Sequence, residues 1–194
     1  MKAELKSLIT EIKRCTLCAK HLDHEPRPVV QLGNKAGLLI AGQAPGRKVH
    51  ETGIPFDDPS GDRLREWMGI SKDIFYNENK IAILPMGFCY PGKGKSGDLP
   101  PRPECAPAWR QPVLDQLPNI QFIIVIGKYA MDWHLGNKQK NNLTETVKAW
   151  KSYALDVIPL PHPSPRNNIW LSKNPWFEDE VLPALKKRVK KALK

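Results

Sequence analysis

The sequence predicts an α/β fold in which helices cover both faces of a parallel sheet. Short apolar runs recur along the 194 residues, and segments with the apolar periodicity of helices separate them. Strands buried on both faces read as continuous apolar runs, and alternation of strands with helices is typical of parallel sheets. Because a chain of this length can bury a substantial core, we expect a single domain over residues 1–194.

The first half of the chain contains two predicted helices and two predicted strands. Residues 3–14 carry an apolar stripe at helical spacing, and the capping residues Asp58 and Ser60 open a second helix that closes near Gly69. The two strands are the buried runs LLIAG and KIAILPM, at residues 38–42 and 80–86.

The second half continues the alternation. Strands are predicted at residues 120–127 and 153–160, and helices at residues 106–117, 128–135 and 176–193. Pro107 lies in the first turn of its helix, and Pro118 stops that helix. Residues 88–104 are rich in proline, glycine and lysine and contain almost no apolar residues, so we expect a long loop there.

The net charge of +10, from 30 Lys and Arg against 20 Asp and Glu, favours a polyanionic partner such as nucleic acid. No apolar run approaches the roughly 20 residues that a transmembrane helix needs. The charged, periodic N-terminus lacks the apolar segment of a signal peptide. We therefore expect a cytoplasmic protein without a membrane partner, and a monomer.

The chain has four cysteines, and their spacing favours a metal centre. Cys15 and Cys18 form a CxxC pair, while Cys89 and Cys105 flank the predicted loop. The two thiolates of a CxxC pair can reach one centre, and two more complete either a tetrahedral zinc site or an iron–sulfur cubane. Disulfides are disfavoured in a cytoplasmic protein, and the alternative is a set of unrelated free thiols.

A glycine- and proline-rich loop, GQAPG, follows the first predicted strand, and its backbone can approach a ligand closely. Further along, an aromatic ring, Phe56, directly precedes two carboxylates, Asp57 and Asp58. This combination suits a flat base whose glycosidic bond is to be hydrolysed. The alternative is that Phe56 belongs to the core and that Asp58 only caps the next helix.

A histidine enclosed by prolines follows the last predicted strand, in 157-VIPLPHPSPRNN-168. Proline restricts its own φ to about −65° and also limits the residue before it, so His162 has little backbone freedom. Ligand sites in parallel sheets form at the carboxyl ends of the strands. The loops that follow the first, second and fourth strands are therefore expected to converge. A histidine held only for structural reasons is the alternative.

Together these segments resemble the uracil-DNA glycosylase superfamily. GQAPG is similar to its first motif, and HPSPRN is similar to its second motif in the form found in single-strand-selective monofunctional uracil glycosylases. The stretch TGIPF, followed by Ser-Gly and a helix, also matches. The cysteine pattern is similar to the iron–sulfur branch of the superfamily, so the resemblance covers residues 15 to about 168.

The resemblance implies a three-layer αβα sandwich around a central, mainly parallel four-stranded sheet. It also implies a structural [4Fe-4S] cluster on the four cysteines, with zinc as the less favoured occupant. The target nucleotide would be flipped out of the DNA into a pocket. Phe56 would stack on the flipped base, and His162 would donate a hydrogen bond to a base carbonyl oxygen as the glycosidic bond breaks. The positions matched to the pocket are Gly42, Gln43, Ala44, Phe56, Pro85 and His162. The loop that would enter the DNA consists of Pro163, Ser164, Pro165, Arg166 and Asn167.

The chain departs from the iron–sulfur branch at two places in the pocket: in the first motif and at Pro85. Gln43 stands where that branch usually carries glutamate, and the Ala-Pro that follows replaces the water-handling Asp or Asn of other branches. The segment FDDPSGD is similar to that of a branch with a comparable apolar first motif, which uses an Asp shortly after the Phe. This resemblance implies that Asp58, or else Asp57, positions the attacking water, with Gln43 as a further catalytic residue. Pro85 stands where the iron–sulfur branch has the Asn that reads uracil, which keeps deaminated purines or a damaged base open as substrates.

The leading hypothesis is a monofunctional DNA glycosylase that hydrolyses the bond between a deaminated or damaged base, uracil first, and its sugar, leaving an abasic site. No lysine lies at the two motifs, which disfavours lyase chemistry. The alternative is a protein of this fold that binds DNA without excising a base. A third hypothesis, an iron–sulfur or zinc redox protein unconnected to DNA, is disfavoured by the positive charge and by HPSPRN.

Overall fold

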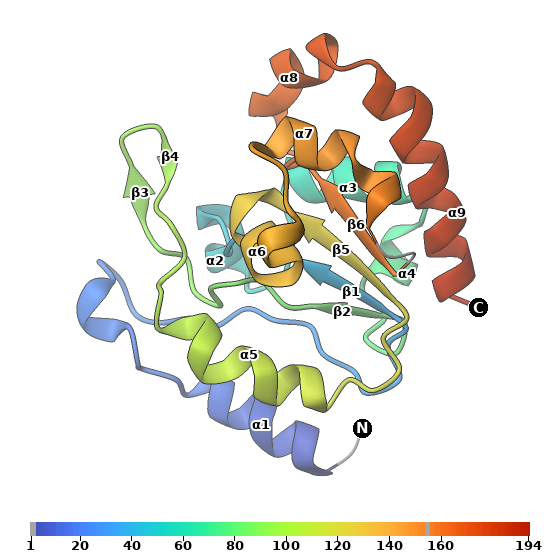
Figure 1. Ribbon diagram of the computed structural model, residues 1–194. Helices are drawn as coiled ribbons and strands as arrows, with labels where there is room; N and C mark the ends of the chain where they lie inside the picture. The colour runs from blue at the N-terminus through green and yellow to red at the C-terminus, as the bar shows by residue number, and fades with distance from the viewer. Residues whose placement is uncertain (1–2, 154–155) are drawn as a thin grey trace.

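The structure of the protein, a computed structural model, describes residues 3–153 and 156–194. Its centre is a four-stranded parallel sheet in the order β2-β1-β5-β6 (Figure 1). The strands are β1 (Leu38–Ala41), β2 (Ile81–Ile83), β5 (Phe122–Ile126) and β6 (Val157–Leu160). The four predicted strands are confirmed, although the last begins at Val157, and residues 154–155 of its predicted range lie outside the described residues.

Both faces of the sheet are buried, because successive side chains of each strand point to opposite sides. In β1, Leu38 and Ile40 belong to one hydrophobic cluster and Leu39 belongs to another. The helices in the first cluster include α3 (Pro59–Met68) and α9 (Leu182–Ala192), and those in the second are α1 (Ala3–Lys13) and α5 (Cys105–Asp115). Figure 1 shows α1 and α5 side by side along one edge of the molecule. The predicted αβα layers are therefore confirmed.

The remaining helices are shorter. The predicted helix after β5 is α6 (Gly127–Leu135), and the predicted C-terminal helix begins with the π-helical turn η5 (Phe177–Val181) before α9. The helices α2 (Arg47–Thr52), α4 (Lys72–Phe75), α7 (Leu143–Lys148) and α8 (Asn168–Lys173) were not predicted. Elements of four to six residues are too short to display apolar periodicity. None of the helices in the described ranges is long and apolar enough to cross a membrane.

The expectation of a loop without regular structure over residues 88–104 was wrong at its centre. The strands β3 (Lys93–Gly94) and β4 (Gly97–Asp98) form an antiparallel hairpin, which projects from the body of the molecule in Figure 1. Gly97 has a φ of 146°, which residues with side chains rarely adopt. The hairpin has no apolar alternation, so the pattern that predicts strands is missing from its sequence.

Candidate functional site

The loops after β1 and β2 are joined by backbone hydrogen bonds at one end of the sheet. The Met86 N–H donates to the Gly42 carbonyl at 2.8 Å, and the Gly87 N–H donates to the Gln43 carbonyl at 2.9 Å. The tip of the Phe56 ring lies 3.7 Å from the position that a Gly42 side chain would occupy. The tip of the aromatic ring therefore lies close to the backbone of this loop.

The β3–β4 hairpin brings the loop after β6 to the same place. A carboxylate oxygen of Asp98 lies 3.6 Å from the position that a Gly46 side chain would occupy. A guanidinium nitrogen of Arg166 lies 3.1 Å from the corresponding position at Gly97. The loops after β1, β2 and β6 therefore converge at one end of the sheet, as the sequence predicted.

His162 lies directly after β6, between two buried prolines. Its ring nitrogen Nδ1 accepts a hydrogen bond from the Ser164 N–H at 3.2 Å, and its carbonyl accepts one from the Asn167 amide at 2.7 Å. Because Nδ1 is an acceptor in this arrangement, a neutral His162 ring carries its proton on Nε2. The loop thus fixes both the orientation of the ring and its tautomer.

Burial lowers the pKa of His162 below its ordinary value, while the carboxylates of Asp58 and Asp98 act in the opposite direction. The imidazole is therefore neutral at pH 7. A neutral ring with its proton on Nε2 offers one hydrogen-bond donor without a positive charge.

The side chains of residues 163–167, the rest of the second motif, differ in direction: some are turned into the loop and others face outward. The Ser164 hydroxyl accepts from the Arg166 N–H at 3.2 Å, and the Ser164 carbonyl accepts from Arg63 at 3.1 Å. Asn167 is turned toward His162 by its bond to that carbonyl. Pro165 and Arg166 are exposed. Of the residues predicted to enter DNA, these last two are the ones that present their side chains outward.

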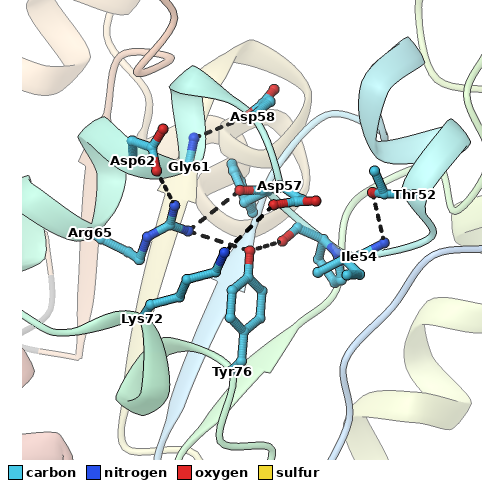
Figure 2. Close-up of polar contacts among 11 residues, drawn as sticks. Thr52, Ile54, Asp57, Asp58, Gly61, Asp62, Arg65, Lys72 and Tyr76 are labelled. Atoms are coloured by element: carbon cyan, nitrogen blue, oxygen red, sulfur yellow. Dashed lines mark hydrogen bonds and ion pairs between the residues drawn. The ribbon is translucent and has the colours of Figure 1, made fainter.

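The two aspartates that follow Phe56 differ in their surroundings (Figure 2). Asp58 Oδ1 accepts from the Gly61 N–H at 2.8 Å and so caps α3, while its other oxygen has no hydrogen bond within residues 3–153 and 156–194. Asp57 lies 3.9 Å from Lys72 Nζ and lines a separate cavity together with Lys72 and Tyr76. The Asp58 carboxylate also raises the pKa of His162, against the effect of burial.

The loops after β1 and β2 also contain Gln43, Ala44 and Pro85. The Gln43 side-chain amide donates to the Leu99 carbonyl at 3.1 Å, so it ties the loop after β1 to the segment beyond the hairpin. Pro85 is buried, and its carbonyl accepts from Arg110 at 3.0 Å. Ala44 lies near Gly87, with its Cβ 3.6 Å from the position of a side chain there.

All four cysteines line one cavity, together with Gly87 and Phe88 of the loop after β2. The Trp109 indole N–H donates to Cys15 Sγ at 3.3 Å, and the Phe88 backbone N–H donates to Cys105 Sγ at 3.3 Å. Burial raises the pKa of Cys89 to about 11 and that of Cys105 to about 12. At pH 7 these thiols therefore lose their protons only when a positive charge, such as that of a metal, lies next to them. Four free thiols thus face one space, as expected for a shared centre.

Within residues 3–153 and 156–194, no three histidine, cysteine or carboxylate side chains are gathered closely enough to hold a single metal ion. The four thiols are therefore spread around the cavity.

Comparison with known proteins identifies the family of the chain. Residues 29–186 match the family model described as the uracil DNA glycosylase superfamily. The chain belongs to this superfamily. A Type-4 uracil-DNA glycosylase from Thermotoga maritima is 28% identical over 176 residues, which cover 84% of this chain and 83% of that protein.

Membership of the uracil-DNA glycosylase superfamily confirms the resemblance on which the sequence interpretation depends and gives the chain its reaction class, hydrolysis of the bond between a base and its deoxyribose. The sequence gave no indication that three residues lie near the candidate site: Asp98, Arg65 and Tyr76. Asp98 lies on a hairpin that was not predicted, and the other two reach the Phe56 segment through contacts between α3, α4 and the preceding loop. Only the folded arrangement reveals such contacts.

Proposed function

We propose that this protein is a monofunctional uracil-DNA glycosylase in which neutral His162 donates a hydrogen bond from Nε2 to the departing base. The observation that carries the proposal is the hydrogen bond from the Ser164 N–H to Nδ1, because it leaves Nε2 as the donor. Asp58, Phe56 and the loop 42–46 lie around the same end of the sheet.

The reaction breaks the bond between the sugar carbon and the base nitrogen, and the bonding electron pair leaves with the base. Phe56 would stack on the flipped base, with the backbone of Gly42 beneath the ring tip. Negative charge then develops on a base carbonyl oxygen, which a donor already in place stabilises in the transition state. His162 suits this role because its loop holds the ring before the substrate binds.

A water molecule supplies the hydroxyl that the sugar carbon gains, and the other proton of that water ends on the released base. Asp58 is the carboxylate we assign to position it, because one of its oxygens is held by Gly61 and the other has no hydrogen bond in the part of the chain that the structure describes. Asp57 is paired with Lys72 and lines another cavity, so it is the weaker alternative. Gln43 shapes the pocket through its bond to Leu99.

The DNA would lie across the outward-facing part of the second motif. Pro165 and Arg166 are exposed beside the hairpin, whose Lys93 and Lys95 are also exposed. Basic side chains of this kind bind phosphates and make the affinity depend on salt. We further propose that residues 1–194 act as one cytoplasmic, monomeric domain, with Pro163, Ser164 and Asn167 supporting the DNA-entering loop.

The four cysteines fit a [4Fe-4S] cluster, with Cys15, Cys18, Cys89 and Cys105 as its ligands. Their thiols face one cavity, and the N–H donors of Trp109 and Phe88 point at two of the sulfurs, as suits thiolate ligands. Bound there, the cluster would supply a covalent crosslink between distant segments and no step of the hydrolysis. Zinc is the less favoured occupant, since Zn–S bonds of about 2.3 Å require thiols gathered around one ion.

A second function, DNA binding without base excision, is favoured by one observation. Pro85 is buried with its carbonyl held by Arg110, and a proline side chain offers no hydrogen bond to the edge of uracil.

A base-release assay on cluster-loaded protein separates the two functions. Oligonucleotides carrying uracil, hypoxanthine or xanthine are incubated with excess protein, and abasic sites are detected by alkaline cleavage. We expect release of uracil and an intact strand before alkali, as a monofunctional enzyme requires. Binding to these oligonucleotides without release of any base would establish the second function instead.

A further inference from the structure

Phe56 has a backbone conformation that requires an explanation. Its φ is 54°, and among the residues that the structure describes it is the one non-glycine residue with a positive φ. A bulky side chain is strained in this region, and such strain persists only where surrounding contacts impose it. Phe56 is also the residue whose ring direction matters for a stacked base.

Two side chains from different helices hold the backbone on either side of this residue (Figure 2). The Tyr76 hydroxyl, beyond α4, donates to the Pro55 carbonyl at 3.0 Å. The Arg65 guanidinium, on α3, donates to the Phe56 carbonyl at 3.4 Å and to the Tyr76 oxygen at 3.4 Å. Consecutive carbonyls are thus bound by two side chains that are themselves in contact.

Arg65 is fixed by its own contacts. It is 7% exposed, it forms an ion pair with Asp62, and its guanidinium lies 5.1 Å from the centre of the Phe75 ring. The Phe56 ring packs edge to face on that same Phe75 ring, with centroids 6.0 Å apart. Arg65 therefore supports Phe56 through both its carbonyl and its ring.

Gly61 allows the tight turn that this arrangement needs. A side chain at Gly61 would begin 1.8 Å from the Phe56 carbonyl oxygen, which is a collision with backbone. The N-terminus of α3, capped by Asp58, therefore lies directly against the strained residue.

We propose that Arg65 and Tyr76 are positioning residues, which hold Phe56 in its strained conformation so that its ring is preset to stack on the flipped base. This inference rests on the proposed function and deepens it. Neither residue touches the substrate. Presetting the ring lowers the freedom lost when the base enters, and small errors in such placement reduce rates strongly.

The test is a double-mutant cycle between Tyr76→Phe and Phe56→Ala, measured as uracil release under single-turnover conditions. Tyr76→Phe removes one hydroxyl and leaves the ring in the core. If Tyr76 acts through Phe56, Tyr76→Phe slows release about tenfold in the wild-type background and less than about twofold beside Phe56→Ala. Equal effects in the two backgrounds would overturn the proposal, because a general structural role does not depend on Phe56. Tyr129→Phe, on α6, is the matched control and leaves the rate unchanged.

A second readout does not depend on activity. The ¹³C chemical shifts of Phe56 report its backbone conformation, and we expect the signature of positive φ in the wild type and its loss in Tyr76→Phe. Unchanged shifts in Tyr76→Phe would refute the positioning role. A wild type that releases no base would refute the proposed function, and the shifts would still decide whether Tyr76 holds Phe56.

Discussion

His162 shows how a short motif can define chemistry at the scale of a single residue. The flanking prolines restrict the backbone, and Ser164 and Asn167 each add one hydrogen bond to the ring or to its carbonyl. The sequence indicated the restraint, since it depends on neighbouring residues. The tautomer could not be predicted, because it depends on the direction of one backbone N–H in the folded loop.

The first prediction concerns the protonation of His162. Because burial lowers its pKa, the His162 ring takes up a proton at a lower pH than an ordinary histidine does. ¹⁵N NMR of the ring should show protonated Nε2 and unprotonated Nδ1 at pH 7, with titration beginning only at lower pH. A ring that is doubly protonated at pH 7 would contradict the neutral donor.

The second prediction distinguishes the two aspartates. Asn caps a helix about as well as Asp, so Asp58→Asn should keep α3 intact while removing the carboxylate that we propose positions water. We expect single-turnover base release to fall by about 10²-fold or more in Asp58→Asn. Asp57→Asn is the matched control and should change the rate less than about threefold, since exposed ion pairs contribute little. Reversed effects would assign the water to Asp57.

At the scale of elements, α5 is linked to β2 and α6 by one buried guanidinium. Arg110 is fully buried, donates to the carbonyls of Leu84 and Pro85, and contacts His134 Nε2 at 2.6 Å. Burial and the Arg110 charge lower the pKa of His134 to about 3, so His134 is a neutral acceptor for Arg110. The sequence predicted α5 from the prolines at its two ends and α6 from its place after a strand, but it gave no sign of this link, which joins residues far apart in the chain.

The third prediction follows from this depressed pKa. In the unfolded chain His134 takes up a proton near pH 6.5, whereas in the folded protein it does so only near pH 3. The unfolded state therefore binds more protons between these values, and the free energy of unfolding falls as the pH drops below about 6.5. Urea unfolding at pH 7 and pH 5 should show a smaller loss for His134→Gln than for the wild type. His21→Gln, at an exposed histidine, is the control, and equal losses in all three proteins would refute the link.

At the scale of the whole molecule, the cysteine cavity joins parts of the chain that the sheet does not. Its lining comes from the segment after α1, the loop after β2 and the start of α5. The layers and the convergence of the site loops follow from apolar patterning and from the alternation of strands with helices, which the sequence displays. The hairpin and the short helices depend on glycine conformations and long-range contacts, so the sequence could not predict them.

The fourth prediction concerns loss of the proposed [4Fe-4S] cluster. Leu5 and Ile12 are buried in the second hydrophobic cluster, so α1 should stay docked when iron is removed. Residues 14–28 and 89–104 contribute no side chain to either hydrophobic cluster, and their amides should lose protection from hydrogen exchange. The C-terminal helix α9 serves as the internal reference. Unchanged exchange in both segments would show that the cysteines do not hold them through a metal centre.

The most direct test of the account is single-turnover uracil release by cluster-loaded wild type and by His162→Ala. Because the donor stabilises charge that appears only in the transition state, we predict release by the wild type and a rate about 10²- to 10³-fold lower for His162→Ala, with unchanged DNA affinity. Equal rates for the two proteins, or no release of uracil by the wild type, would contradict it.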